Sequence, residues 1–329
     1  RTFKIVDPEA ALKDVADATV TVAGQTYTGK ALKPAPTVTL GNKTLVKGTD
    51  YTVTYANNTK AGKATVTITG VRAAGYKGTK SVTFSIAKAK ISKAAATIAT
   101  QAYTGKALVP APKLTYGGKT LVKGTHYTLA YASNVKVGTA TITVTGKGNF
   151  SGTKAVKFKI AKLTVTPAKT KYAYTGKVIT PGVTVKIGAT TLTKDTHYTV
   201  KYASGRKVVG TYNIKVTLKG GYAGTKTVSF AIAPKATAIS KLAAGSKAFT
   251  ATWKKQSTQT TGYQIQYALK KDFSGPKTVT ISKVGTTSKK FASLKAKATY
   301  YVRVRTYHKT GDKTYYSAWS AAKTVTTKA

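Results

Sequence analysis

Apolar and polar residues alternate one by one along many short stretches of the chain. Residues 64–69 read Ala-Thr-Val-Thr-Ile-Thr, and residues 140–145 and 213–218 show the same alternation with β-branched side chains. Such an alternation places the apolar residues on one face of a β-strand, where β-branched side chains pack well. No stretch of ten or more residues has a convincing 3.6-residue period. The pattern therefore predicts an all-β chain.

Glycine and proline interrupt this alternation about every ten residues, a spacing typical of β-sandwiches. The pairs Gly-Asn at 41–42 and Gly-Gly at 117–118 fit two-residue hairpin turns. Proline cannot donate a hydrogen bond to a β-ladder. The Pro-x-Pro segments at 34–36 and 110–112 therefore mark an edge strand or a point where the chain changes sheets.

The same succession of motifs occurs three times. The tetrapeptide Tyr-Thr-Gly-Lys begins at Tyr27, Tyr103 and Tyr174, at intervals of 76 and 71 residues (103 − 27 and 174 − 103). Each copy is followed by Thr-Asp/His-Tyr-Thr, by Tyr-Ala, and by a closing Gly-Thr-Lys that leads into Val-x-Phe-x-Ile. Three tandem copies of one unit predict an array of similar modules.

These landmarks resemble those of the bacterial Ig-like modules called MBG-type repeats, which occur in tandem in large surface proteins of Gram-positive and related bacteria. The resemblance covers residues 18–233 and implies three Ig-like β-sandwiches. Two copies depart from the pattern. The second has Asn149-Phe150 where the others have Gly-Tyr, and the third has Pro181-Gly182 in place of Pro-x-Pro and Asp195 in place of a loop glycine.

A different pattern begins at residue 234. Trp253 ends an alternating strand, and Leu294 stands six residues (300 − 294) before Tyr300, which opens the run Tyr-Tyr-Val-Arg-Val-Arg. This order resembles a fibronectin type III domain, with the tryptophan of an early strand and a tyrosine corner whose hydroxyl bonds back to the backbone. We expect Trp253 in the core. Trp319 either joins the core or stacks over the nearby arginines.

Residues 1–6, Arg-Thr-Phe-Lys-Ile-Val, resemble the closing strand of each repeat. We therefore expect the chain to be an internal fragment of a longer secreted protein, and we leave open whether this strand pairs with another chain. Residues 7–17 would form a short helical turn or linker. The sequence predicts an elongated rod of tandem Ig-like sandwiches and one fibronectin type III sandwich. The expected segments are 1–17 (closing strand of a preceding module and linker), 18–89, 90–162 and 163–233 (the three repeats), and 234–329 (the last domain).

The chain is strongly cationic, with 55 Lys+Arg against 8 Asp+Glu and a formal net charge of +47. Four of the eight acids lie within the first 17 residues, so the positive charge extends over every module. Residues 90–162 hold 12 lysines and no acid, and residues 234–329 hold 19 Lys+Arg and two acids. A solvated strand face normally mixes both signs. Such a field attracts polyanions, although charge of one sign could also simply keep a rod extended and monomeric.

No residue pattern indicates catalysis. The chain has no cysteine, which excludes disulfides and thiolate metal sites, and its acids are too sparse for paired-carboxylate chemistry. His126 and His197 occupy the repeat position of Asp50, which we interpret as a surface loop position that tolerates either residue. An internal Lys–Asn isopeptide bond would need a neighbouring acid, and the second repeat has none. We expect no enzyme, no cofactor and no metal site.

Most of the 21 tyrosines recur at equivalent places in the repeats, which favours core or strand-pairing roles. The last domain offers freer aromatic and guanidinium groups. The candidate ligand contacts are Tyr315, Tyr316, Trp319, Arg303 and Arg305.

The leading hypothesis is a non-enzymatic stalk and adhesion region of a bacterial surface or secreted protein. Its lysines would bind anionic polymers, such as teichoic acid-like cell-wall polymers or acidic host glycans, through many weak contacts. One alternative is a specific adhesin that recognises a host surface protein or glycan through one module. A second is a set of accessory domains beside an extracellular enzyme outside this segment. Nucleic acid would bind only non-specifically, and no membrane insertion is expected.

Overall fold

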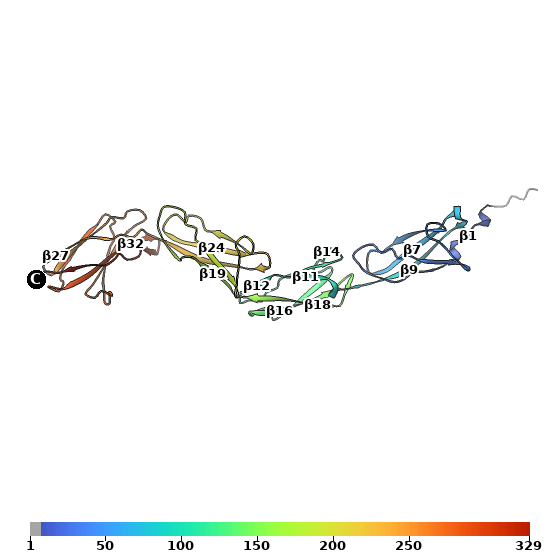
Figure 1. The fold of residues 1–329 in the computed structure, drawn as a ribbon, viewed down its shortest axis with the longest axis horizontal. Coiled ribbons are helices and arrows are strands. Elements are labelled where there is room, and N and C mark those ends of the chain that lie inside the picture. The colour runs from blue at the N-terminus through green and yellow to red at the C-terminus, as the bar shows by residue number, and fades with distance from the viewer. Residues whose placement is uncertain (1–7) are drawn as a thin grey trace, which may run out of the picture. The chain divides into compact units, whose positions relative to one another are not determined.

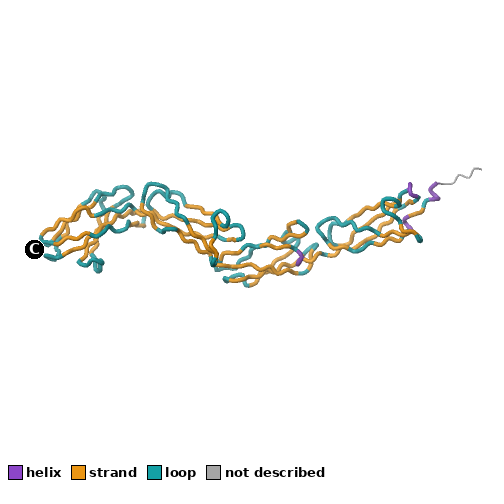
Figure 2. Tube along the Cα trace, in the orientation of Figure 1, coloured by secondary structure: helices purple, strands orange, loops and turns teal. Residues whose placement is uncertain are grey.

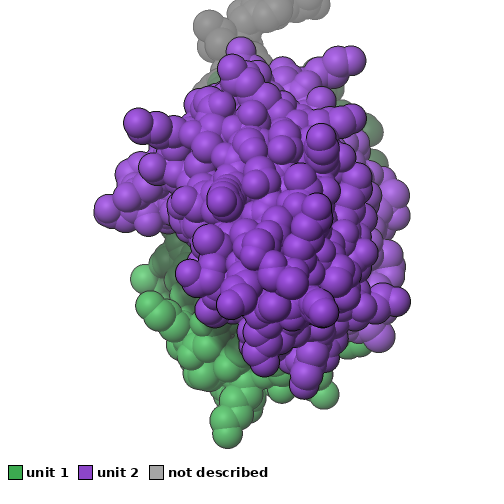
Figure 3. Space-filling model, turned by 90° about the vertical axis from the view of Figure 1, so that its left-hand side faces the viewer, with its two compact units in different colours: residues 1–161 green, residues 162–329 purple. Residues whose placement is uncertain are grey.

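The computed structural model describes residues 8–329, and β-strands dominate this part of the chain (Figures 1 and 2). Contacts within the chain define two compact units, residues 1–161 and 162–329 (Figure 3). The expected strand at residues 1–6 lies outside the described residues. Short helical turns η1 (Pro8–Ala11) and η2 (Val15–Asp17) lie where the sequence predicts a helical turn or linker. Val15 is fully buried in the core of the first repeat, so η2 is part of that sandwich and not a linker before it.

The first repeat is a sandwich of two sheets, each with an apolar inner face. The four-stranded sheet has the order β3-β9-β7-β6, and the three-stranded sheet has the order β2-β4-β5. Val38 of β4 and Ile68 of β7 are fully buried between the sheets. The bounds are β1 (Lys13–Asp14), β2 (Thr19–Thr21), β3 (Gln25–Thr26), β4 (Thr37–Leu40), β5 (Lys43–Thr44), β6 (Tyr51–Ala56), β7 (Gly62–Gly70), η3 (Arg72–Ala74), β8 (Tyr76–Lys77) and β9 (Thr79–Ala87).

The Pro-x-Pro segment of this repeat connects the two sheets. It lies between β3 of one sheet and β4 of the other and has no regular structure, so the prediction of a change of sheet is confirmed. The turn at 41–42 joins β4 to β5, with Leu40 opposite Lys43. The predicted two-residue hairpin is therefore present.

The second repeat has the same arrangement. Within this repeat, the larger sheet has the order β12-β18-β16-β15, and the three-stranded sheet has the order β11-β13-β14. Leu114 of β13 and Ile142 of β16 belong to the same core cluster, and both are fully buried. The bounds are β10 (Ala89–Lys90), η4 (Ile91–Lys93), β11 (Ala95–Thr97), β12 (Thr100–Ala102), β13 (Lys113–Tyr116), β14 (Lys119–Thr120), β15 (Tyr127–Ala132), β16 (Gly138–Gly146), β17 (Phe150–Ser151) and β18 (Thr153–Ala161).

The first two repeats share a packed joint. The ring of Tyr27 packs against the cores of both repeats and lies edge-on to Phe150, with 5.5 Å between ring centroids. The Tyr116 hydroxyl donates to the carbonyl oxygen of Tyr27 (3.0 Å), and the backbone N–H of Ala61 donates to Asn149 Oδ1 (3.0 Å). The departure of the second repeat from Gly-Tyr to Asn149-Phe150 thus has a physical reason, because both residues contact the first repeat.

Gly117 allows the close approach at this joint. Its φ is +55°, and a Cβ atom at this position would clash with the Thr28 carbonyl oxygen. Any side chain would therefore force the two repeats apart.

The third repeat has sheets β20-β26-β24-β23 and β19-β21-β22. Ile214 of β24 and Phe230 of β26 lie at the centre of its core. The bounds are β19 (Leu163–Pro167), β20 (Lys171–Ala173), β21 (Val183–Ile187), β22 (Thr190–Thr191), β23 (Tyr198–Tyr202), β24 (Gly210–Leu218), β25 (Tyr222–Ala223) and β26 (Thr225–Ala233).

The C-terminal domain has one sheet of order β27-β28-β31 and one of order β30-β29-β32-β33, in which β34 also pairs with β32. Trp253 is 2% exposed, which confirms its predicted place in the core. The Tyr300 hydroxyl accepts a hydrogen bond from the backbone N–H of Lys295 (3.1 Å), so the predicted tyrosine corner is present. The bounds are β27 (Ile239–Gly245), β28 (Ala248–Trp253), β29 (Gly262–Ala268), β30 (Lys277–Ile281), β31 (Ser288–Phe291), β32 (Thr299–Thr310), β33 (Lys313–Tyr316) and β34 (Lys323–Thr326).

The third repeat and the C-terminal domain are joined through polar contacts. The backbone N–H of Val209 donates to Gln259 Oε1 (3.0 Å), and the Thr211 hydroxyl donates to the Tyr315 hydroxyl (3.3 Å). These contacts fix Tyr315, one of the predicted ligand contacts, at the joint within the second unit.

Candidate functional site

The repeat position shared by Asp50, His126 and His197 has a definite structural role. Asp50 Oδ2 accepts a hydrogen bond from the backbone N–H of Val46 (2.8 Å). The Nδ1 atoms of His126 and His197 accept the equivalent bonds, from Val122 (2.8 Å) and Thr193 (3.0 Å). A carboxylate and an imidazole can both supply this acceptor. The expectation of a merely tolerant surface position was therefore incomplete, because Asp50 is only 6% exposed and caps the loop.

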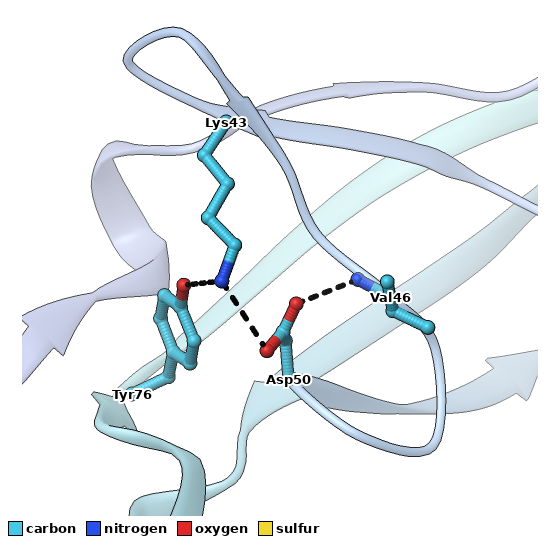
Figure 4. Close-up of polar contacts among 4 residues, drawn as sticks. All are labelled: Lys43, Val46, Asp50 and Tyr76. Carbon is cyan, nitrogen blue, oxygen red and sulfur yellow. Dashed lines mark hydrogen bonds and ion pairs between the residues drawn. The ribbon is translucent and has the colours of Figure 1, made fainter.

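Asp50 belongs to a small polar cluster in the first repeat (Figure 4). Lys43 Nζ lies 2.8 Å from the Tyr76 hydroxyl and 3.7 Å from Asp50 Oδ1. The hydrogen bond to Tyr76, and to a lesser degree the charge of Asp50, raises the pKa of Lys43 above its ordinary value. The ammonium group therefore stays protonated here. The cluster stabilises one loop and carries no further titratable partner for catalysis.

Replacement of Asp50 tests this loop role. We expect Asp50→Ala to lower the free energy of unfolding of the first repeat by about 1–3 kcal/mol, because the Val46 N–H loses its acceptor. Asp50→His should cost less than half as much, since the other repeats already use histidine there. Hydrogen exchange of β6 and β7 amides in the intact chain measures both changes. Equal losses for the two variants would contradict the proposed acceptor role.

The recurrent tyrosines are mostly structural, as predicted. Tyr51, Tyr127 and Tyr198 are buried at the start of the equivalent strands β6, β15 and β23. Further along the same strands, three hydroxyls donate to backbone carbonyls of the proline-containing segments. These bonds join Tyr55 to Pro34 (2.6 Å), Tyr131 to Pro110 (3.0 Å) and Tyr202 to Pro181 (2.6 Å).

Tyr103 corrects this expectation for the Tyr-Thr-Gly-Lys position. Its side chain is 45% exposed, whereas Tyr27 is half-buried at the joint of the first two repeats. The motif tyrosine lies at the end of its sandwich, so its burial depends on what packs against that end. Recurrence in sequence therefore does not prove a core position here.

Three lysines of the closing Gly-Thr-Lys motif are also structural. The ammonium groups of Lys80, Lys154 and Lys226 donate to backbone carbonyls 62 to 64 residues earlier in the chain, at 2.8 to 2.9 Å. Each bond ties the start of the last strand to the first segment of its own sandwich. The predicted cationic surface included these lysines, and only their recurrence within the motif could have indicated this structural role.

Most of the positive charge has no acidic partner. Within residues 8–329, the cationic side chains within 4 Å of a carboxylate are Lys43, Arg72 and Lys194. The remaining lysines lie largely on exposed faces and loops. A surface of this kind has a high positive potential that salt screens over about 8–10 Å.

Four of the five predicted ligand contacts meet on the outer face of the C-terminal domain. The Arg305 guanidinium lies over Tyr316 (4.0 Å to the ring centroid) and Trp319 (4.2 Å). The Arg303 guanidinium lies between Phe273 (3.8 Å) and Trp319 (4.9 Å). Of the two alternatives for Trp319, the structure therefore has the stacked arrangement. Phe273 was not among the predicted residues, and no sequence signal indicated its contact with Arg303.

Two glutamines accept hydrogen bonds from the guanidinium groups of this cluster. Arg305 donates through Nε (3.0 Å) and Nη2 (2.6 Å) to Gln264 Oε1, and Arg303 makes the same pair of bonds to Gln266. Burial lowers the pKa values of both arginines, although they remain charged because guanidinium is so strongly basic. The stacked rings and the glutamine hydrogen bonds together form a ladder that orients each arginine. Tyr315 lies apart from it, at the joint with the third repeat.

The described residues contain no group of three or more His, Cys, Asp or Glu side chains that could hold a metal ion. In the same part of the chain, no helix is long and apolar enough to cross a membrane. The distributed lysines and the arginine–aromatic ladder remain the two candidate binding surfaces.

Comparison with known proteins identifies the C-terminal domain. Residues 233–323 match the family model of the fibronectin type III domain. This match agrees with the tyrosine corner and the buried Trp253, so these residues form a fibronectin type III domain. No curated protein matches the chain.

Two solved structures with similarity to the chain are segments of larger proteins that span several domains. One is the FN1–FN3 segment of chicken CNTN1, with 16% identity, a TM-score of 0.27, and coverage of 59% of this chain and 79% of that one. Another comprises domains A168–A170 of titin, with 14% identity, a TM-score of 0.24, and coverage of 85% and 98%. Similarity at these values carries no inference about function.

Proposed function

We propose that this chain is a non-enzymatic stalk and adhesion region whose lysines bind anionic polymers. The observation that carries this proposal is the uncompensated charge. The sequence has 55 Lys+Arg against 8 Asp+Glu, and three cationic side chains within residues 8–329 have a carboxylate within 4 Å. Tandem sandwiches followed by a fibronectin type III domain also suit a spacer that presents a binding face or anchors the protein to a surface.

The proposed setting is the surface of a bacterium, or its secreted proteins. Support comes from the resemblance of the three repeats to MBG-type modules and from the absence of cysteine in the sequence. The polymer would be a teichoic acid-like component of the cell wall or an acidic host glycan. Both carry many negative groups along a flexible chain.

The binding mechanism is the sum of many weak contacts. A single exposed lysine gains little from one phosphate or carboxylate in water, because the attraction is screened and the side chain loses freedom. Repetition along the polymer and along the sandwiches turns each further contact into an intramolecular event. We therefore expect high avidity without a deep pocket.

Retention of the fluorescently labelled chain on cell walls tests this proposal. Intact walls are compared with walls chemically stripped of their anionic polymers, at one salt concentration near 0.15 M. Immobilised host mucin serves as a second surface and an uncharged protein coat as the control. Strong retention on intact walls or mucin and little on stripped walls or the control is expected. Equal retention on intact and stripped walls, without binding to mucin, would overturn the anionic-polymer proposal.

A specific adhesin remains the alternative, supported by the ladder of Arg303, Arg305, Tyr316 and Trp319. Its rigid aromatic and cationic groups could recognise one host protein or glycan. That function would show as binding that survives high salt and disappears with Trp319→Ala. Accessory domains beside an extracellular enzyme are a further alternative, which the sequence adjoining this segment would decide.

A further inference from the structure

Two lysines face each other directly on the third repeat. Lys201 of β23 is the register partner of Lys215 of β24 in the antiparallel ladder, and both side chains are exposed. Directly opposite residues in such a ladder have Cβ atoms about 4.5–5.5 Å apart, and like charges in these positions are destabilising. The arrangement therefore carries an electrostatic cost in the free chain.

Neither ammonium group is neutralised within the described chain. The carboxylates that lie within 4 Å of a cation there contact Lys43, Arg72 and Lys194 instead. Lys226 of the same repeat donates to the Leu163 carbonyl oxygen (2.9 Å), but no hydrogen bond of this kind involves Lys201 or Lys215. Both charges are therefore available to an external anion.

Hydroxyl and amide groups surround the two lysines on the same face. In β26, Thr227 lies beside Lys215. The neighbouring rows, two residues to either side along the strands, are also polar and exposed. They are Thr199, Thr217 and Thr225 on one side, and Asn213 and Ser229 on the other. Such groups can donate hydrogen bonds to an oxyanion held between the lysines.

The other repeats show that the fold does not need lysines here. The equivalent register pairs are Thr54 with Thr67 in the first repeat and Ala130 with Thr143 in the second. The same strands form with neutral side chains at both positions. The lysine pair is thus a property of the third repeat alone, and the sandwich itself does not explain it.

We propose that Lys201 and Lys215 form a binding site for a tetrahedral oxyanion, a phosphodiester or sulfate ester group carried by the polymer. This inference rests on the proposed function and names the chemical group that the third repeat prefers. An anion between the two ammonium groups removes their repulsion and accepts a charge-assisted hydrogen bond from each. Two oxygens of a tetrahedral group can accept the bonds from the lysines. Its other oxygens lie outside the plane of these two and the central atom, where Thr227 or its neighbours can reach them. A carboxylate has only two oxygens, both in one plane.

The test uses a double variant with a matched control. Lys201→Thr with Lys215→Thr gives the third repeat the Thr–Thr pair that the first repeat has at the equivalent positions. Lys169→Thr with Lys186→Thr removes the same charge from the same sandwich at two exposed positions, with Lys186 opposite threonines. Affinities of the whole chain are measured for poly(glycerol phosphate), for heparin as the sulfated polymer, and for polygalacturonate as the carboxylate polymer.

We expect the first variant to lose about tenfold in affinity for at least one of the phosphate and sulfate polymers. The control should lose about twofold or less, as for an exposed charge, and polygalacturonate should not distinguish the variants. Whichever polymer shows the tenfold loss identifies the source of the oxyanion. Thr54→Lys with Thr67→Lys, added to the first variant, should restore most of the lost affinity, because it rebuilds the pair in the first repeat.

Equal losses for the two double variants would overturn the lysine-pair site while charge-driven binding still stands. A loss that extends equally to polygalacturonate would overturn the preference for a tetrahedral group. If the unaltered chain binds none of the three polymers, the proposed function fails and the site with it. Hydrogen exchange of β23 and β24 confirms that each variant keeps its fold, and at low salt the first variant should be more protected than the unaltered chain.

Discussion

Replacement of Phe150 by alanine is expected to lower the free energy of unfolding of the second repeat by about 3–5 kcal/mol. Phe150 is 2% exposed and belongs to the core of this repeat. Its ring also lies edge-on to Tyr27 of the first repeat and to Tyr116, with centroid distances of 5.5 and 5.2 Å. Alanine would leave a cavity at the centre of the joint as well as in the core.

Hydrogen exchange of β16 and β18 peptides in the intact chain measures this loss, because their slowest amides exchange through unfolding of the repeat. Phe150→Tyr is the matched control. Tyrosine stands at the equivalent positions 76 and 222, so this change should cost about 1.5 kcal/mol or less. Tyr27→Ala should loosen the joint while sparing most of the second core. Unchanged protection of β16 in Phe150→Ala would contradict the described packing.

The second large effect is expected from Trp253→Ala in the fibronectin type III domain, at about 3–5 kcal/mol. The indole is 2% exposed and packs against Tyr263 with 5.5 Å between ring centroids. Its Nε1–H is buried without a hydrogen-bond partner. Trp253→Phe removes that unpaired donor and keeps much of the apolar volume, so it should cost markedly less than alanine.

Tryptophan fluorescence follows this change in the whole chain, because both tryptophans of the sequence belong to the C-terminal domain. Urea unfolding of Trp253→Ala, observed through Trp319, should show a lower midpoint, and hydrogen exchange in residues 8–161 should stay unchanged. An unshifted midpoint would show that the indole does not support the core.

The sequence predicts the sandwiches because the long strands of the repeats alternate apolar and polar residues and many of the turns contain glycine or proline. The change of sheet at residues 34–36, the hairpin at 41–42, the core position of Trp253 and the tyrosine corner at Tyr300 all follow from residue types at fixed spacings. Such local signals act within a few residues or within one strand. They do not depend on how one module contacts the next.

Features that depend on the joints and on register could not be predicted in this way. Tyr27 is half-buried because the second repeat packs against it. Tyr103, the same motif residue, has no following repeat in its own compact unit and is 45% exposed. Tyr315 serves as a joint residue because Thr211 lies opposite it. The ladder at Arg303 includes Phe273, which is 30 residues away (303 − 273) in the sequence. The facing of Lys201 and Lys215 becomes visible only when the strands are paired.

We propose that lysine charge drives binding, and the salt dependence of affinity tests this most directly. Affinity of the whole chain for poly(glycerol phosphate) is measured between about 50 and 500 mM salt, a range that shortens the screening length severalfold. We expect log affinity to fall linearly and steeply with log salt, because each lysine–phosphate contact releases a counterion. An affinity that stays constant over this range would contradict the claim and would favour specific recognition by one module.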